Sequence, residues 1–275
     1  MFAEKIYWVT GASSGLGEAL AKTLAAEGAR LILSGRNEAE LRRVAADCGA
    51  PGQHLILPFD VTEFDHLPQV TEQAFTWRGQ IDGLINNAGI SQRSLATETD
   101  FSVYQRMINT DLLAPIALTQ RVLPHMVKAK CGRIVMITSV AGKAGSPMRT
   151  AYSAAKFGLN GYAEALRCEV AMHGINVHTI APGSIKTNVS VNALTGDGSR
   201  RGESDPAIEN GMDPLKAAKR MIAAIKREER DIVIARGFEL KMTQMRKRSP
   251  NKLFDAMAAT VARGYAAQMK AGAKS

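Results

Sequence analysis

Residues 6–28 read IYWVTGASSGLGEALAKTLAAEG, and this stretch decides the fold. Strand-forming residues come first, then a turn with glycines spaced Gly-x-x-x-Gly-x-Gly, then a strongly helix-forming segment that ends at Gly28. A glycine turn between a strand and a helix lets backbone amides and the positive end of the helix dipole approach a phosphate. The order predicts a dinucleotide pocket; a glycine turn without a ligand is the alternative. The expected cofactor contacts here are Gly11, Ser13, Ser14, Gly15, Leu16 and Gly17.

Apolar runs alternate with helical stretches along most of the chain. We expect strands at 5–10, 30–34, 54–58, 82–86, 132–138, 175–181 and 231–236. We expect helices near 15–27, 37–47, 63–78, 100–129, 151–173 and 213–228, with the fourth kinked at Pro115. Strand–helix alternation is typical of a parallel sheet covered on both faces. The predicted fold class is α/β, a Rossmann-type, doubly wound, seven-stranded parallel sheet in three layers.

The end of the second expected strand carries a basic residue. Arg36 lies nineteen residues after Gly17, where a pocket for NAD(H) usually has an acidic residue on the ribose hydroxyls. A guanidinium at that place suits a 2′-phosphate, so the sequence predicts NADP(H) in preference to NAD(H). A solvated surface arginine is the alternative, and Glu38 lies close by in the sequence.

Two polar residues four positions apart suggest acid–base chemistry. Tyr152 and Lys156 are separated by about one helical turn, so their side chains share one helix face. A phenol has a pKa near ~10, and a cation held nearby lowers that pKa toward the range where proton transfer is efficient. Ser139 lies thirteen residues upstream of Tyr152. Alone, the pair is also compatible with an ordinary amphipathic surface.

The motifs taken together resemble a known family. Over roughly residues 5–190 the chain resembles a classical short-chain dehydrogenase/reductase, with the motifs in the family's order. They are Thr10-Gly11-x-x-x-Gly15-x-Gly17, Asp60-Val61, Asn86-Asn87-Ala88-Gly89, Asn109, Ser139, Tyr152-x-x-x-Lys156 and Pro182-Gly183-Ser184-Ile185-Lys186-Thr187. One such motif would mean little, whereas the complete set in register is very specific.

The resemblance implies four catalytic positions. Tyr152 would exchange a proton with the substrate oxygen, and Lys156 would hold the nicotinamide ribose and lower the phenol pKa. Ser139 would hydrogen-bond the substrate carbonyl. Asn109 would anchor a water that leads protons to Lys156, although a buried helix asparagine bonded to backbone is the alternative.

The resemblance also implies the remaining cofactor contacts. Asp60 and Val61 would touch the adenine, although Asp60 could instead cap a turn before Thr62. The cofactor cleft would be lined by Asn87, Ala88 and Gly89. The nicotinamide would be bordered by Pro182, Gly183, Ile185 and Thr187, of which Ile185 and Thr187 would orient its carboxamide.

We expect residues 1–236 to form the dinucleotide-binding catalytic domain. Within it, residues 188–212 are rich in glycine, charge and small side chains, which predicts a mobile loop that covers the substrate as a lid; a disordered connector is the alternative. Residues 237–275 are expected to form a basic, amphipathic, helical C-terminal extension. From Arg236 onward the chain has nine basic and two acidic residues, a net charge of +7 out of +9 in total.

The extension has an apolar stripe at helical spacing after Pro250. It comprises Leu253, Phe254, Met257, Val261, Tyr265 and Met269. Packing of the stripe on the domain is one explanation. Contact with an anionic membrane surface or a lipidic substrate is another, and a subunit contact is a third. No reader module for nucleic acid is present, so we expect no nucleic-acid partner.

Composition is compatible with one globular enzyme domain. The 275 residues are 45% hydrophobic and 22% charged. The three cysteines are widely spaced, and neither they nor the scattered histidines predict a disulfide framework or a metal site. Because no targeting or membrane-spanning pattern is visible, we expect a cytoplasmic location, with peripheral membrane contact through residues 237–275 as an option.

The function expected from these residues is carbonyl–alcohol interconversion. The substrate would be a small carbonyl compound or alcohol, the hydride carrier NADP(H), and the assembly a homodimer or homotetramer by resemblance alone. A non-catalytic dinucleotide-binding sensor or scaffold is the alternative, although it has no need for the four catalytic positions together. A third alternative is an enzyme of the same fold that uses the hydride for dehydration or epimerisation. Such relatives usually have a larger C-terminal domain, so the short substrate region after Thr187 weakly disfavours it.

Overall fold

The computed structural model describes residues 1–50, 52–265 and 267, and its centre is a seven-stranded sheet. The strands are β1 (Ile6–Thr10), β2 (Arg30–Ser34), β3 (His54–Ile56), β4 (Gly83–Asn86), β5 (Gly132–Ile137), β6 (Ile175–Pro182) and β7 (Asp231–Ile234). They pair in parallel in the order β3-β2-β1-β4-β5-β6-β7. This confirms the predicted doubly wound sheet and places the reversal of strand order between β1 and β4.

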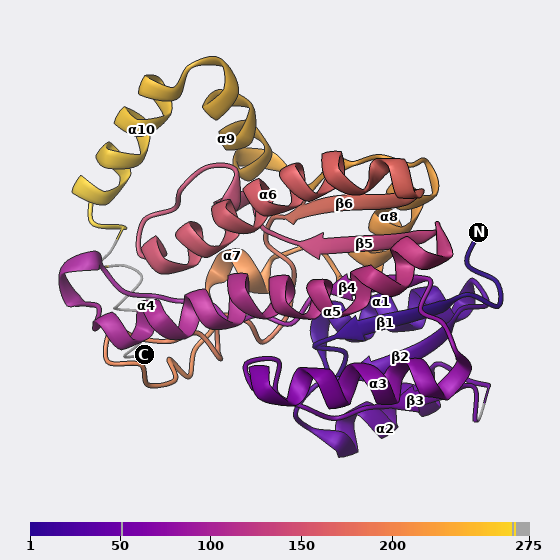
Figure 1. The fold of residues 1–275 in the computed structure, drawn as a ribbon. Coiled ribbons are helices and arrows are strands. Elements are labelled where there is room, and N and C mark those ends of the chain that lie inside the picture. Colours follow the sequence, from indigo (N-terminus) through magenta and orange to yellow (C-terminus); the bar gives the residue numbers. More distant parts are fainter. Residues whose placement is uncertain (51, 266, 268–275) are drawn as a thin grey trace.

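Helices cover both faces of the sheet, which gives three layers (Figure 1). One face packs against α1 (Gly15–Ala26), α2 (Glu38–Asp47) and α8 (Pro214–Lys226). The other packs against α3 (Leu67–Arg78), α5 (Ala114–Ala129) and α6 (Thr150–Val170). The remaining helices are α4 (Phe101–Ile108), α7 (Pro206–Glu209), α9 (Gly237–Arg248) and α10 (Pro250–Ala262). Short 3₁₀ turns lie at Phe64–His66, Ala96–Glu98, η4 (Val140–Gly142) and Ala171–His173.

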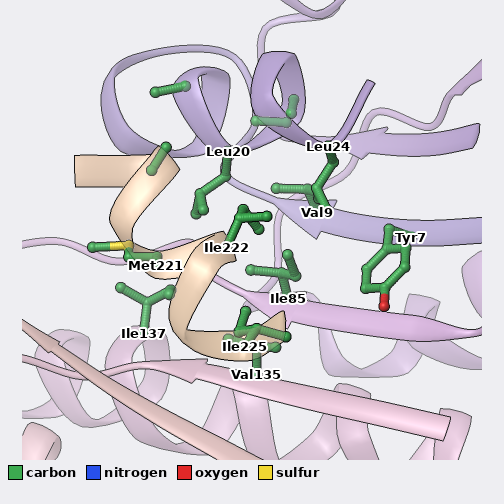
Figure 2. Close-up of a cluster of buried hydrophobic side chains, with 14 of the residues drawn as sticks. Tyr7, Val9, Leu20, Leu24, Ile85, Val135, Ile137, Met221, Ile222 and Ile225 are labelled. Atoms are coloured by element: carbon green, nitrogen blue, oxygen red, sulfur yellow. The ribbon is translucent and has the colours of Figure 1, made fainter. Parts of the chain in front are cut away.

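Alternate strand residues point into the two hydrophobic cores, one on each face of the sheet. Val9, Ile85 and Val135 face the side on which α1 and α8 pack, as Figure 2 shows. Trp8 faces the opposite core, where it is fully buried and its Nε1 donates a 2.9 Å hydrogen bond to Ser34 Oγ. The two-residue period of a strand accounts for this division, because both faces of a covered parallel sheet must be apolar.

The fourth expected helix is not one continuous helix. A π turn, η3 (Asn109–Leu113), separates α4 from α5, and the Ala114 amide reaches back five residues to the Asn109 carbonyl. Pro115 is the second residue of α5 and directly follows the π turn. The irregularity expected at Pro115 is therefore a wider helical turn that precedes the proline.

Residues 188–212 are folded against the domain. Leu194 pairs with Gln92 in a parallel bridge, Leu194 N donates to Ser91 O, and Arg93 N donates to Leu194 O. The segment also contains α7 and a bridge between Ile185 and Met212. The expected position over the substrate side stays a prediction, but this segment has regular local structure rather than the bare loop that its composition suggested.

The C-terminal extension is a pair of helices, α9 and α10, that stands away from the sheet (Figure 1). Only part of its surface packs on the domain, where Met242 and Leu253 are buried against Ala144. In the predicted stripe Leu253 is buried, Met257, Val261 and Tyr265 are half-buried and Phe254 is exposed, while Met269 lies outside the described residues. Among the described helices, none has the length and apolarity needed to span a bilayer.

A buried histidine braces the amino-terminal edge of the sheet. His178 on β6 is 0% exposed, and its Nδ1 lies 2.6 Å from the Glu229 carbonyl. Arg133 Nε donates to His178 Nε2, and Arg133 Nη1 donates to the Tyr7 hydroxyl. Since Nε2 accepts and Nδ1 donates, the ring is in its neutral form. Burial lowers the pKa of His178, and the adjacent Arg133 lowers it further.

We predict that His178 makes the protein acid-sensitive. Below about pH 6.5 the imidazole is protonated in the unfolded chain but stays neutral in the folded chain. The free energy of unfolding therefore falls as pH decreases, by at most about 1.4 kcal/mol per pH unit. Urea unfolding at a series of pH values measures this slope. His178→Gln should reduce this slope, to which His54 also contributes because burial lowers its pKa, whereas His66→Gln, at an exposed histidine, should retain it; equal slopes in both variants would contradict the assignment.

Candidate active site

The glycine turn lies at the carboxyl end of β1, where the strand order reverses. Gly11 and Gly15 have φ of 64° and 57°, a backbone conformation that favours glycine. A Cβ on Gly17 would lie 2.0 Å from the Gly11 carbonyl oxygen, so only glycine allows this turn. Open sheets of this topology bind ligands in the crevice at such a reversal.

The first turn of α1 borders this crevice. Ser14 is its N-cap, but the Ser14 side chain makes no capping hydrogen bond. The amides of Gly15, Leu16 and Gly17 are thus not satisfied by a cap, and they are the donors that a phosphate requires. A Cβ on Gly15 would lie 3.1 Å from Thr187 Cγ2, and one on Gly35 would lie 3.3 Å from Ser13 Oγ. Because side-chain volume would fill this cradle, the residues present fit a dinucleotide.

A threonine that we did not predict as a site residue holds the crevice together. Thr10 Oγ1 accepts hydrogen bonds from the Asn87 and Ala88 amides, at 3.0 and 3.1 Å. The Asn87 side chain donates to the Thr10 and Gly11 carbonyls. Asn87 and Ala88 therefore lie beside the glycine turn, as expected for the cofactor cleft. Thr10 is the first residue of the motif Thr10-Gly11-x-x-x-Gly15-x-Gly17, and this place in the motif could have indicated its role from the sequence.

Arg36 lies at the end of β2 with its side chain 78% exposed. Its Nη1 is 3.8 Å from Asp60 Oδ2, a long contact that leaves most of the guanidinium accessible. Asp60 Oδ1 accepts from the Thr62 amide and hydroxyl, so the turn-capping alternative for Asp60 also holds. Val61 follows, half-buried. Glu38 pairs with Arg42 instead of Arg36.

Three of the four predicted catalytic positions lie where η4 packs on α6. Ser139 is 6% exposed, and its Oγ accepts the Ala141 amide at 3.1 Å, which leaves the hydroxyl proton free to donate. Lys156 is 4% exposed, and its Nζ lies 5.7 Å from the centre of the Tyr152 ring. Lys156 Nζ donates to the Ile137 carbonyl at 3.1 Å. The Tyr152 hydroxyl forms no hydrogen bond with the part of the chain that the structure describes.

The fourth predicted position, Asn109, is corrected by the structure. The Asn109 side chain is exposed at the start of the π turn, whereas Asp111, two residues further on, is 0% exposed. Asp111 Oδ2 lies 3.1 Å from Lys156 Nζ, and Asp111 Oδ1 accepts the Ile90 amide at 2.8 Å. Asp111, like Thr10, is a residue that sequence reasoning missed. Its signal was the four-residue spacing Val103–Met107–Asp111, which marks the buried face of this segment.

Burial and charge oppose one another in the Lys156–Asp111 pair. Burial lowers the pKa of Lys156, but the Asp111 carboxylate outweighs burial and holds that pKa above its ordinary value. Burial raises the pKa of Asp111, which the Lys156 ammonium and the Ile90 amide counteract. Gly89 is next to this pair, because a Cβ there would lie 3.2 Å from the Asp111 carboxylate. The expected cleft residue Gly89 thus leaves space for Asp111.

The segment after β6 lies beside the glycine turn through Thr187. Pro182 ends β6 and Ile185 is buried, while a Cβ on Gly183 would lie 2.2 Å from Glu239 Oε2 and would displace that carboxylate. Glu239 on α9 accepts from the Ser184 amide at 2.9 Å and the Ser184 hydroxyl at 2.7 Å. The C-terminal extension therefore fixes the backbone of the expected nicotinamide segment.

A buried ion cluster ties the substrate-side segments together. Asp205 is 1% exposed and accepts hydrogen bonds from Arg93 (2.7 Å), Arg149 (3.2 Å) and Arg201. Arg149 is the N-cap residue of α6, about one turn before Tyr152. Next to it, the Ala151 amide donates a hydrogen bond to the buried Gln92 side chain. The cluster therefore joins the segment after β4, the start of α6 and the 188–212 segment.

The doubly wound sheet, the glycine crevice and the Tyr152–Lys156 pair define the class of NAD(P)-dependent oxidoreductases. Residues 5–197 match the family model described as short chain dehydrogenase. The chain belongs to this family, and it is a dehydrogenase/reductase that acts on small-molecule substrates.

Curated relatives agree with this assignment. The "Dehydrogenase/reductase SDR family protein 7-like" of Drosophila melanogaster is 41% identical over 236 residues, which cover 84% of this chain and 72% of that protein. The "Dehydrogenase/reductase SDR family member 7B" of Danio rerio is 38% identical over 239 residues, 84% of this chain and 77% of that protein.

Solved structures agree on the fold. A short-chain dehydrogenase from Streptomyces avermitilis superposes with a TM-score of 0.80 at 28% identity, over 95% of this chain and 98% of that one. Levodione reductase superposes with a TM-score of 0.77 at 25% identity, over 87% and 99% of the two chains.

Proposed function

We propose that this chain is an NADP(H)-dependent oxidoreductase that interconverts a small-molecule carbonyl and an alcohol. The observation that carries the proposal is the Tyr152–Lys156 pair beside Ser139, where a buried ammonium lies 5.7 Å from a phenol ring. The comparisons give no support to the alternative of a non-catalytic sensor or scaffold. The bound nicotinamide supplies or accepts the hydride.

The chain's own residues handle the substrate oxygen. In reduction, negative charge grows on the carbonyl oxygen, where the Ser139 and Tyr152 hydroxyls donate hydrogen bonds. Tyr152 then transfers its proton to that oxygen. Lys156 holds the nicotinamide ribose and places a positive charge beside the phenol. Asp111 takes the position that Asn109 was expected to occupy, as a direct carboxylate partner of Lys156.

We predict that Tyr152→Phe removes catalysis without removing cofactor binding. The variant keeps the ring and loses the acid, so kcat should fall by about a hundredfold to ten-thousandfold. The assay is a screen of carbonyl compounds with NADPH, followed at the nicotinamide absorbance band. Tyr162→Phe, half-buried on the same helix, is the matched control and should retain the wild-type rate. Near-normal turnover by Tyr152→Phe would refute the mechanism.

A preference for NADP(H) is supported by Arg36. Its guanidinium is exposed at the β2 end, and Glu38 is engaged with Arg42 on α2. No carboxylate follows the strand at Ser34, Gly35 or Arg36 to bind the ribose hydroxyls of NAD(H). A hydrogen bond from a guanidinium to a phosphate contributes about 1.5–3 kcal/mol, which corresponds to about tenfold to a hundredfold in affinity.

We predict that Arg36→Ala lowers kcat/KM for NADPH by about tenfold to a hundredfold and leaves the value for NADH nearly unchanged. The selectivity ratio, measured with one carbonyl substrate, reports the 2′-phosphate contact. Arg42→Ala, at an exposed α2 arginine, should not alter the ratio. A wild-type preference for NADH would overturn the cofactor proposal.

We also propose that the α9–α10 extension contacts anionic phospholipid bilayers. Phe238 and Phe254 are 57% and 52% exposed on it, and Arg246 stacks 5.5 Å from the centre of the Phe254 ring. Arg246, Lys247 and Arg248 end α9 together, all exposed and in no ion pair with a described residue. Exposed aromatic rings beside clustered cations suit the headgroup region.

We predict that the full-length chain co-sediments with phosphatidylglycerol vesicles and that replacing Arg246, Lys247 and Arg248 by glutamine reduces binding more than tenfold, at about 1 kcal/mol per cation. Replacing Lys216, Lys219 and Arg220 on α8 by glutamine removes the same charge from another surface and is the control. Equal loss in both triple variants would argue against a specific contact.

The assembly and location remain proposals of the same kind. Exposed Phe101, Leu113 and Phe157 on the α4–α6 side favour a homodimer or homotetramer, which sedimentation velocity distinguishes from a monomer. We propose a cytoplasmic location with peripheral membrane contact through residues 237–275, and cell fractionation tests it.

A further inference from the structure

The family resemblance implies a neutral amide near Lys156, but the structure places a carboxylate there. Asp111 is completely buried, and Lys156 is the cation in contact with it. The Oδ2–Nζ distance is 3.1 Å, but Oδ2 has no hydrogen-bond partner among the described residues, so the contact is chiefly an ion pair. The Ile90 amide satisfies Oδ1.

The groups that face this pair are few. Lys156 Nζ faces Asp111 from the π turn, the Ile137 carbonyl from β5 and the Tyr152 ring from its own helix. Around Tyr152 pack apolar residues and Tyr104, whose hydroxyl is bonded to Thr150 Oγ1 at 2.7 Å. The ionisable unit is therefore Tyr152–Lys156–Asp111, with one formal negative charge beside one formal positive charge.

A negative charge in a dry site favours the protonated form of each neighbouring group. With an amide in place of the carboxylate, burial would favour loss of the Lys156 proton. If the ammonium persisted, its uncompensated charge would favour loss of the phenol proton. Either event removes a proton that reduction of a carbonyl requires, and either acts as pH rises. The carboxylate opposes both events.

We propose that Asp111 is a positioning residue that keeps Lys156 and Tyr152 protonated and so adapts the active site to carbonyl reduction, extending its activity to higher pH. The inference rests on the proposed function and adds to it the pH range in which each direction of the reaction runs. In the oxidative direction Tyr152 must accept a proton, so the same carboxylate raises the pH at which oxidation becomes active.

The decisive variant is Asp111→Asn, which keeps the shape and an oxygen for the Ile90 amide. We expect the alkaline limb of the pH profile of kcat/KM for reduction with NADPH to move down by about one to three pH units. At a fixed pH on that limb the rate then falls tenfold or more. Asp65→Asn, at an exposed carboxylate, should leave the limb in place. Asp111→Ser serves the same purpose if the asparagine variant fails to fold.

A second measurement uses the chain without cofactor. Tyrosinate absorbance is titrated in wild type and Asp111→Asn, and each Tyr152→Phe counterpart is subtracted so that Tyr152 is isolated from the five tyrosines. We expect the isolated phenol to ionise at lower pH in Asp111→Asn when Lys156 remains charged. When Lys156 loses its proton instead, the phenol shift is absent but the limb still moves down.

The outcomes separate the inference from the proposed function. Wild-type turnover with superimposable pH profiles for wild type and both Asp111 variants would overturn the inference and leave the function standing. A downward shift of the limb with retained thermal stability supports it, since a merely structural role would lower activity at every pH. Absence of wild-type turnover with every carbonyl compound tested, or full activity of Tyr152→Phe, would instead defeat the proposed function.

Discussion

The ammonium of Lys156 has almost no access to water, and much of the site follows from that constraint. A buried cation is tolerated only with partners, and Lys156 finds them in the Ile137 carbonyl and the Asp111 carboxylate. These partners come from β5 and from the π turn, while Lys156 itself comes from α6. The pair thus fixes three elements relative to one another, and Tyr152 is positioned because it shares a helix face with Lys156.

A second close approach, between backbones, shapes the other half of the crevice. Gly17 packs against the Gly11 carbonyl, and Gly11 packs against Ala88 and the Asn87 side-chain amide, so the turns after β1 and β4 are in close contact. Thr10 joins the same turns by hydrogen bonds. Asp111 connects the two halves, because Ile90, which follows this β4 turn, donates to the carboxylate that holds Lys156. The expected cofactor contacts and the acid–base group are therefore parts of one packed unit.

The sequence was sufficient for the architecture because strand and helix periods differ and each buried face needs apolar residues. All seven strands lie within the expected stretches or within one residue of them. Asn109 was chosen by residue type alone; its side chain is exposed, whereas Asp111, which continues the buried face of Val103 and Met107, reaches Lys156. The regular structure of residues 188–212 could not be predicted from the sequence. It depends on hydrogen bonds to Asp205 from Arg93 and Arg149, which are distant from Asp205 in the sequence.

The C-terminal extension shows how a region outside the family's common pattern still acts on the site. Glu239 holds the Ser184 backbone, while Met242 and Leu253 pack on Ala144, two residues beyond η4. Both contacts lie on segments that border the expected nicotinamide and substrate positions. A hydrogen bond from the Ser184 amide to the Glu239 carboxylate therefore links α9 to the residue before Ile185. The exposed cations and phenylalanines are on these same helices. The helices therefore connect the surface proposed to meet a bilayer with the backbone proposed to orient the nicotinamide.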